Sequence, residues 1–319
     1  MRAAVVIPNW NGSKWLTGCL DAVAAQTRPA DEVIVVDDAS QDDSVDVAAS
    51  QPLAPRVLAL PTNGGFGRAV NEGIRAASTD AVALVNVDVV LAEDWLERTV
   101  RALEDEPRAA AVATKMVAMH DPGVLDDTGD FLRRDGAAEQ RGRFRRDQGL
   151  WDEPEEVWGA CAGAALFRRD PVLGLGGFEE RFVMYLEDTD LALRLRLAGW
   201  RCRYEPVLAR HHGASSEGER SRTVMGWVAR NTLLIVVKYF PLRWAPFVAY
   251  RQAAWAWHAL RERRLRQHLG GIVSAGPLLP TMLRERAEVR RTALVPIAEA
   301  VPHRPIRGAA AGGHPGSPA

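Results

Sequence analysis

An α/β fold is predicted for this 319-residue chain: a mostly parallel sheet with helices on both faces, followed by a helical extension. The first half of the chain alternates short apolar runs, most of them rich in Val, with stretches whose apolar residues recur at helical spacing. Acidic or polar residues follow these runs, at the strand ends where open α/β sheets bind their ligands. Beyond residue 222 the pattern is helical.

The apolar runs predict four strands, at residues 3–7, 32–36, 56–60 and 81–85. The stretches that follow them predict four helices, at residues 13–26, 42–50, 67–77 and 93–104. Right-handed crossovers would bring the carboxyl ends of these strands to one edge of the sheet.

Residues 120–156 interrupt the alternation with a polar, charged and Gly-containing sequence. We expect a long excursion over the site here, because structureless segments of this length in compact domains are usually functional or mobile. Regular structure is predicted again at 157–168, with a helix at 189–198 and a strand near 201–205.

The composition excludes several classes of protein. Hydrophobic residues make up 47% of the chain, too many for a wholly disordered protein. Cys19, Cys161 and Cys202 form no C-x-x-C pair, so we expect no disulfide scaffold or structural zinc, and a reducing, cytoplasmic compartment. The N-terminal apolar run ends at a proline and is too short for a signal peptide, and no run is long enough for a transmembrane helix.

The net charge of −1 is unevenly distributed. Residues 1–220 hold 25 Lys+Arg against 37 Asp+Glu, whereas residues 221–291 hold 13 against 3. An acidic body and a basic segment indicate two surfaces with different partners. We expect a main domain at 1–220, a basic, Trp-rich helical extension at 221–295 and a disordered tail at 296–319.

Two clusters at predicted strand ends suit a nucleotide. Asp37 and Asp38 end the second strand, where a carboxylate can accept a hydrogen bond from a base N–H or a ribose hydroxyl; helix capping is the alternative. The glycines of residues 63–68 precede a helix, where backbone N–H groups can approach an anion; a flexible turn is the alternative. Val70 replaces the third glycine of G-x-G-x-x-G, so a dinucleotide fingerprint is a poor match.

Three more clusters suit catalysis. Asn86 and Asp88 follow the fourth strand, and one carboxylate beside an amide suits Mg²⁺ or Mn²⁺ shared with substrate phosphates. Asp188 lies in a crowded acidic run before a helix, where partial burial would raise its pKa toward that of a general base. Asp190 could instead cap that helix. The histidine pair at 211–212 offers an imidazole metal ligand.

Taken in this order, the clusters resemble the inverting family 2 glycosyltransferases of GT-A fold, and above all their rhamnosyltransferase-like branch. The matching segments cover about the first two-thirds of the chain: VVIPNWNG at 5–12, VVDDAS at 35–40, NGGFGRAVNEG at 63–73, VNVDV at 85–89, GGFEERFVMYLEDTDLALRLRLAGWR at 176–201 and HHGASS at 211–216.

The resemblance implies a nucleotide-sugar site. Asp38 would read the base, and Asp37 would support it or contact the ribose. The other positions implied to bind the nucleotide sugar are Pro8, Asn9, Asn11, Asn63, Gly65, Phe66, Gly67, Asn71, Asn86 and Asp88.

The resemblance also implies a divalent metal, Mg²⁺ or Mn²⁺, that bridges the diphosphate. Asp88 corresponds to the last residue of the D-x-D element and would bind this metal. Asn86 replaces the first Asp, which leaves one fewer anionic ligand. His211 would complete the metal shell, with His212 as the alternative.

Asp188, in the E-D-x-D element, would be the catalytic base, with Glu187 orienting the acceptor or the base. The implied acceptor contacts are Trp158, Gly159, Glu187 and Asp190. The expected partners are a dTDP- or UDP-linked sugar, with rhamnose as the first choice, and a glycan or polyprenyl-linked acceptor of cell-surface polysaccharide synthesis. A galactofuranosyl or other hexosyl transferase is the alternative within the family.

The basic segment contains four of the ten tryptophans, Trp227, Trp244, Trp255 and Trp257, among regularly spaced cations. This combination suits an interfacial helix on anionic lipid, at the inner face of the cell membrane. An ordinary helical cap on the main domain is the alternative. No nucleic-acid motif is present.

Three other functions compete with sugar transfer. The misplaced glycines count against a Rossmann dehydrogenase. Paired carboxylates also occur in glycoside hydrolases, although strand-end nucleotide sites favour transfer. A catalytically silent nucleotide-sugar-binding protein is disfavoured because Asp88 and Asp188 are both present.

Overall fold

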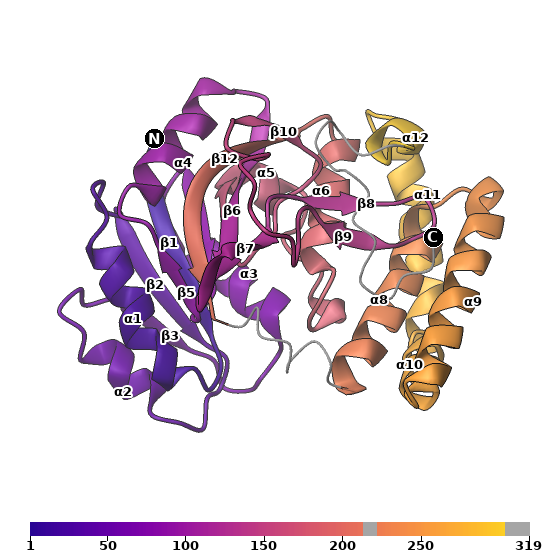
Figure 1. Ribbon diagram of the computed structural model, residues 1–319, viewed down its shortest axis with the longest axis horizontal. Helices are drawn as coiled ribbons and strands as arrows, with labels where there is room; N and C mark the ends of the chain where they lie inside the picture. The colour runs from indigo at the N-terminus through magenta and orange to yellow at the C-terminus, as the bar shows by residue number, and fades with distance from the viewer. Residues whose placement is uncertain (213–221, 304–319) are drawn as a thin grey trace.

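The computed structural model describes residues 1–212 and 222–303. In this part of the chain ten strands form one sheet, ordered β10-β12-β6-β11-β4-β1-β2-β3, with β5 beside β12 and β7 beside β6 (Figure 1). The strands are β1 (Ala3–Asn9), β2 (Glu32–Asp37), β3 (Arg56–Ala59), β4 (Ala81–Val85), β5 (Val89–Leu91), β6 (Ala109–Ala118), β7 (Asp121–Asp127), β10 (Glu155–Val157), β11 (Ala164–Arg168) and β12 (Arg201–His211). A separate hairpin pairs β8 (Asp130–Leu132) with β9 (Ala138–Gln140).

The helices of the first 212 residues are α1 (Ser13–Ala24), α2 (Ser44–Ala49), α3 (Phe66–Ala76), α4 (Trp95–Asp105), α5 (Arg169–Gly174) and α6 (Glu187–Leu197). Those of the C-terminal part are α8 (Arg222–Tyr239), α9 (Ala245–Arg261), α10 (Leu265–Ser274), α11 (Leu279–Thr292) and α12 (Ile297–Ala300). None of the helices in the described ranges is both long and apolar enough to cross a lipid bilayer.

The sheet separates two hydrophobic cores because side chains alternate between its faces. Val6 and Val36 lie in one core with Ile74 of α3, whereas Val5 and Val35 lie in the other, which also contains residues of α1 and α4. Strands β3, β2, β1 and β4 are parallel, and β11 runs antiparallel between β4 and β6. The predicted α/β fold, with a sheet covered on both faces and a helical C-terminal part, is therefore confirmed.

The expected excursion over 120–156 is wrong in part. This segment contains β7, β8 and β9 and the start of β10, and β7 joins the main sheet by pairing with β6, where Leu125 lies opposite Val117. Its polar composition hid these strands, because Asp126 and Asp127 are buried carboxylates in place of apolar residues.

The C-terminal helices pack against α6 through a third core. Leu234, Ile235 and Tyr239 of α8 lie in it with Leu193 and Leu197 of α6, and α8 to α11 form one side of the molecule in Figure 1. This core holds the helices beside the main sheet.

The first part of the tail, expected to be disordered from residue 296, is ordered. Residues 297–300 form α12, and Ala300 and Val301 are buried. The indole Nε1 of Trp158 donates to the Ala300 carbonyl at 2.6 Å, which fixes this segment against the main domain. The rest of the tail, 304–319, lies outside the described residues.

Candidate active site

The floor of the candidate site lies where β1 and β2 end. Asn9, the last residue of β1, lies opposite Asp37, the last residue of β2. Asn9 Nδ2 donates to the Asp37 carboxylate at 2.8 Å, and the Ser40 backbone N–H donates to it at 2.9 Å. Pro8 and Asn9 are buried at the end of β1, where they pair with β2, and their contact with the nucleotide sugar stays a prediction. The Asn9 amide supports Asp37.

Asp38 holds the glycine loop. Its two carboxylate oxygens accept hydrogen bonds from the backbone N–H groups of Gly64, at 2.9 Å, and Gly65, at 2.8 Å. Gly65 has φ +87°, and a Cβ there would lie 2.5 Å from the Val183 carbonyl oxygen, so only glycine fits. Asp38 thus orders the loop, and its contact with a base stays a prediction.

The other predicted nucleotide positions are divided between the rim and the interior. Asn63 and Asn11 are exposed, and Asn11 Oδ1 accepts from the Gln41 N–H at 2.7 Å. Phe66 is half-buried at the start of α3, and Gly67 is buried. The exposed pair and Phe66 are available to a ligand.

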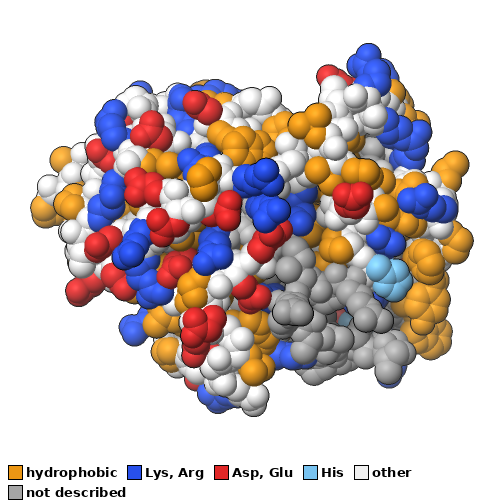
Figure 2. Space-filling view, turned by 90° about the horizontal axis from the view of Figure 1, so that it is seen from above, with side chains coloured by type: hydrophobic (Ala, Val, Ile, Leu, Met, Phe, Trp, Pro, Cys, Tyr) orange, Lys and Arg blue, Asp and Glu red, His pale blue; other side chains and the backbone are white. Residues whose placement is uncertain are grey.

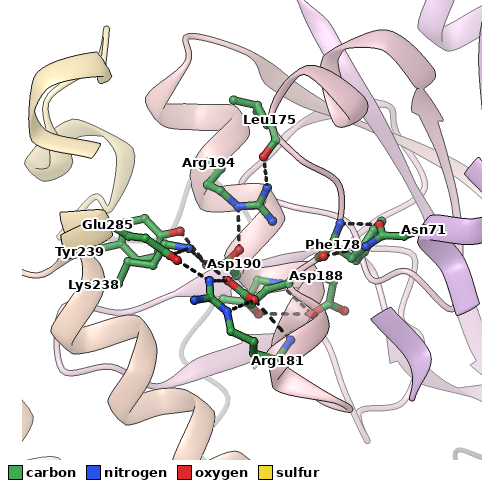
Figure 3. A network of polar contacts seen from close by, with 12 residues as sticks. Asn71, Leu175, Phe178, Arg181, Asp188, Asp190, Arg194, Lys238, Tyr239 and Glu285 are labelled. Atoms are coloured by element: carbon green, nitrogen blue, oxygen red, sulfur yellow. Dashed lines mark hydrogen bonds and ion pairs between the residues drawn. The ribbon is translucent and has the colours of Figure 1, made fainter. Parts of the chain in front are cut away.

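Asn71 faces away from the loop. Its side chain is buried and exchanges two hydrogen bonds with the Phe178 backbone, at 2.9 and 2.7 Å (Figure 3). Its amide also donates to Glu180 at 2.9 Å. The prediction that Asn71 binds the nucleotide sugar is therefore wrong, because its polar atoms secure the segment before α6.

Asp88 and His211 point toward each other across the other end of the site. The Asp88 Oδ2 atom lies 3.3 Å from His211 Nε2, and His211 Nδ1 lies 2.7 Å from Asp126 Oδ2. Burial alone would lower the pKa of His211, but its hydrogen bonds to Asp126 and Asp88 raise that pKa to about 9. Burial acts to raise the pKa of Asp88, yet the His211 contact lowers it overall.

His211, rather than His212, is the imidazole that faces Asp88. The His212 ring packs edge-on against His120, with ring centroids 5.6 Å apart, and its backbone N–H donates to the Asp88 carbonyl at 2.9 Å. Residues 213–216 of the HHGASS segment lie outside the described residues.

The donor set fits a divalent cation held together with substrate phosphates. Such ions take one or two carboxylates from the protein, and a neutral imidazole is a common metal ligand. A carboxylate behind the distal imidazole nitrogen, as at Asp126, orients a histidine ligand. The Asn86 Oδ1 atom is buried without a hydrogen-bond partner and remains free to accept one. No group of three His, Cys, Asp or Glu within the described residues forms a metal site by itself.

Asp188 lies in the first turn of α6. Its carboxylate accepts from the Thr189 N–H at 2.7 Å and from the Ala162 N–H at 3.5 Å. Burial raises the pKa of Asp188 in spite of these bonds. Burial and the neighbouring Asp188 charge raise the pKa of Glu187 to about 8, and Glu187 Oε2 has no hydrogen-bond partner. Raised pKa values of this kind suit proton transfer near neutral pH.

Backbone contacts bring the separate motifs together. The N–H of Ala162 contacts the Asp188 carboxylate, and the carbonyl of the next residue, Gly163, accepts from the Asn86 N–H at 2.8 Å. The Val183 carbonyl accepts from the Phe66 N–H at 2.8 Å. Backbone hydrogen bonds therefore link the N-x-D element to the segment that contacts Asp188, and the glycine loop to the segment before α6.

Sequence reasoning missed three buried carboxylates in one short run, Asp126, Asp127 and Asp130. Burial raises the pKa of Asp127 to about 7, and burial together with the Asp188 charge raises the pKa of Asp130 well above its usual range. The signal was present as DDTGD between Leu125 and Phe131, three acids flanked by apolar residues. The run lies within the polar segment 120–156, which is predicted as an excursion over the site.

Two predicted acceptor contacts are wrong because their residues are packed inside. Trp158 is buried in the third core and donates its indole N–H to Ala300. A Cβ at Gly159 would lie 2.8 Å from the Cβ of Ala192, so this position serves close packing against α6.

Asp190 is the third predicted acceptor contact that the structure contradicts. It is fully buried, accepts from the Tyr239 hydroxyl at 2.6 Å and pairs with Arg194 at 2.7 Å (Figure 3). Lys238 lies 3.5 Å from the same carboxylate. Asp190 therefore joins α6 to α8 and has no surface for an acceptor.

Comparison with known proteins supports a single family. The model of the family "Glycosyl transferase family 2" matches residues 4–175. A curated relative, the N-acetylglucosaminyl-diphospho-decaprenol L-rhamnosyltransferase of Mycobacterium tuberculosis, is 27% identical over 275 residues, which cover 75% of this chain and 87% of that protein.

Solved glycosyltransferase structures share the fold. GalNAc-T7 with UDP, GalNAc and Mn²⁺ has a TM-score of 0.58 at 14% identity and covers 75% of this chain and 48% of that one. S. aureus TarS 1–349 in complex with UDP has a TM-score of 0.55 at 18% identity and covers 92% of this chain and 89% of that one.

Proposed function

Because the chain belongs to glycosyl transferase family 2 and is a glycosyltransferase, we propose that it moves a sugar, with inversion, from a nucleotide diphosphate to an acceptor hydroxyl. The observation that carries this proposal is the position of Ala162 and Gly163, whose backbones contact Asp188 on one side and the N-x-D element on the other. These contacts support a site in which Asp188 acts as the proton acceptor and the N-x-D element binds the diphosphate.

The proposed step needs one base and one stabilised leaving group. The acceptor oxygen forms a bond to C1 of the sugar as the bond from C1 to the diphosphate breaks, and Asp188 takes the hydroxyl proton. Glu187, buried beside it with a raised pKa, orients the acceptor or the base. Asp88 and His211 would hold a divalent cation, which supplies positive charge to the departing diphosphate.

The donor and acceptor proposed are dTDP-rhamnose and a polyprenyl-linked glycan of cell-surface polysaccharide synthesis. The support is the curated relative, named as a rhamnosyltransferase that acts on a decaprenol-linked N-acetylglucosamine. A solved structure of the same fold contains UDP and another contains Mn²⁺. UDP-linked hexoses are the alternative donors.

A ligand screen followed by a transfer assay tests this function. We expect dTDP or UDP to raise the melting temperature in the presence of Mn²⁺ and to lose this effect with a chelator. The nucleotide that stabilises the protein then identifies the sugar donors for transfer to a polyprenyl-diphosphate-linked N-acetylglucosamine. Release of free sugar in the absence of acceptor, or the absence of stabilisation by any nucleoside diphosphate, would reject the proposal.

We also propose that α9 lies against anionic lipid at the inner face of the cell membrane. Phe247, Tyr250, Trp257 and Leu260 recur at helical spacing on α9 and are 55%, 71%, 63% and 51% exposed. In Figure 2 hydrophobic side chains gather along the edge of the molecule that the C-terminal helices form. Exposed cations lie at both ends of α9, namely Arg243, Arg261, Arg263 and Arg266. An apolar stripe with flanking cations matches the chemistry of an anionic lipid surface.

Sedimentation with vesicles tests the membrane proposal. We expect the protein to bind vesicles that contain phosphatidylglycerol, to bind neutral phosphatidylcholine vesicles weakly, and to dissociate in high salt because the cations are then screened. The double variant Phe247→Ser/Trp257→Ser should lose binding, whereas Val45→Ser, at an exposed position in α2 of the main domain, should not. Equal sedimentation of all three proteins would refute the proposal.

A further inference from the structure

The turn before the candidate base has a strained backbone. Val183, Tyr185 and Leu186 have φ values of +64°, +70° and +69°, a region that L-residues rarely adopt and that is least tolerated by a β-branched side chain. Val183 has ψ −57°, and the Met184 N–H donates to the Phe182 carbonyl at 2.7 Å. These values describe the rarer, strained form of the γ-turn. Strained backbone persists only where the surrounding structure holds it.

This γ-turn connects the two halves of the candidate site. On one side its Val183 carbonyl accepts from the Phe66 N–H, and its oxygen would lie 2.5 Å from a Cβ on Gly65. On the other side Leu186 caps α6, and Glu187 and Asp188 follow directly. A change in the turn therefore moves the candidate base relative to the glycine loop.

One side chain from outside the matched family region holds the turn. Asn231 is a fully buried residue of α8, and the family model matches only residues 4–175. The Asn231 Nδ2 atom lies 3.1, 3.0 and 2.8 Å from the carbonyl oxygens of Phe182, Met184 and Tyr185. Its two N–H groups are shared among these three acceptors.

Two further contacts of α8 support the hydrogen bonds from Asn231 to the turn, which we call the clamp. Arg230 donates to Asn231 Oδ1 at 3.0 Å, which occupies the amide oxygen and leaves the NH₂ group for the turn. The Trp227 ring lies 6.5 Å from the Tyr185 ring, centroid to centroid. Both contacts place α8 directly over the strained segment.

We propose that Asn231 is a positioning residue for the proposed transfer reaction. Its amide holds the γ-turn in the geometry that sets Asp188 against the glycine loop, so α8 is part of the active site. The kinetic effect of this inference rests on the proposed function, but the hydrogen bonds of the clamp are tested separately, without any substrate.

Hydrogen exchange of the full-length protein tests the clamp without any substrate. In Asn231→Leu, which keeps a similar volume and removes the donors, we expect the amides of Met184 and Phe66 to exchange at least about 10-fold faster, because their acceptors lie in the released turn. The interior amides of β1 should keep their protection. Thr232→Val is the matched control, since Thr232 is the next residue of α8, is buried, and has a hydroxyl without a partner.

Transfer kinetics test the consequence. We expect Asn231→Leu to lower kcat at least about 10-fold with little change in the affinity for the nucleotide, and Thr232→Val to match the wild-type protein. Asn231→Ser, which keeps one donor, should give an intermediate rate, and it replaces the Leu variant if that variant does not fold. Unchanged exchange in the turn overturns the clamp. Faster exchange with an unchanged kcat overturns the positioning role, and an inactive wild-type protein overturns the proposed function alone.

Discussion

The variant Asp188→Asn is expected to lose sugar transfer by a factor of about 10²–10⁴, the range that general-base catalysis supplies. An amide cannot take the acceptor proton, yet it keeps the shape of the carboxylate and can still accept from the Thr189 N–H. Initial rates with a radiolabelled or mass-tagged donor measure the loss, and titration of the nucleoside diphosphate measures the affinity, which should stay unchanged.

The pH dependence of the wild-type rate gives a second readout for this base. Burial raises the pKa of Asp188 above the usual 3.8, so the protonated, inactive form should persist to higher pH than for an exposed aspartate. The rate should fall as the pH is lowered through the apparent pKa of the Glu187–Asp188 pair. Asp170→Asn, at an exposed carboxylate, is the control. Near-normal turnover of Asp188→Asn would rule out its role as the base.

The second large effect is expected at the Asp88–His211 pair. Asp88→Ala removes the proposed carboxylate ligand, so we expect the binding of dTDP or UDP to become independent of Mn²⁺. In the wild-type protein a chelator should weaken this binding strongly. Calorimetric titration of the nucleotide, with Mn²⁺ and with chelator, measures the difference.

A related prediction concerns Asp126, which lies outside the N-x-D element. Its carboxylate holds His211 Nδ1 at 2.7 Å, and loss of such an orienting partner typically lowers metal affinity by about 10–100-fold. We therefore expect Asp126→Asn to shift the Mn²⁺ concentration that supports nucleotide binding by that factor. Asp127→Asn changes the neighbouring carboxyl and should leave the Mn²⁺ requirement as it is. Identical Mn²⁺ curves for the wild-type protein and Asp126→Asn would contradict the assignment.

The strands and helices of the first half of the chain could be predicted because the fold sets their apolar pattern. Alternate residues of β1 and β2 lie in different cores, so both faces need apolar side chains, and the strands appear as continuous apolar runs. The helices between them have one apolar face each, which gives the spacing that identifies them. The clusters at the strand ends follow from the same pattern.

Residues 120–156 could not be predicted in this way. Their strands bury carboxylates such as Asp127 and Asp130, which burial keeps protonated to higher pH, and no apolar period marks them. The same limit applies to the helix that carries the base. Asp188 and Asp190 lie two residues apart, about 200° around a helix, so one faces the site and the other the interior, and the motif alone does not distinguish them.

The sequence alone determined the parallel strands and helices of the first half of the chain, and the acidic and glycine-rich segments at the strand ends, because periodicity and strand ends depend on neighbouring residues. Only the tertiary structure decided which polar side chains face a ligand and which are enclosed. Asn71 forms a hydrogen bond with buried backbone, and Asp190 accepts one from the buried Tyr239 hydroxyl. Asn231, far along the chain, donates to the turn before the base. Burial and hydrogen-bond partners depend on contacts between distant segments, and the pattern of neighbouring residues does not contain them.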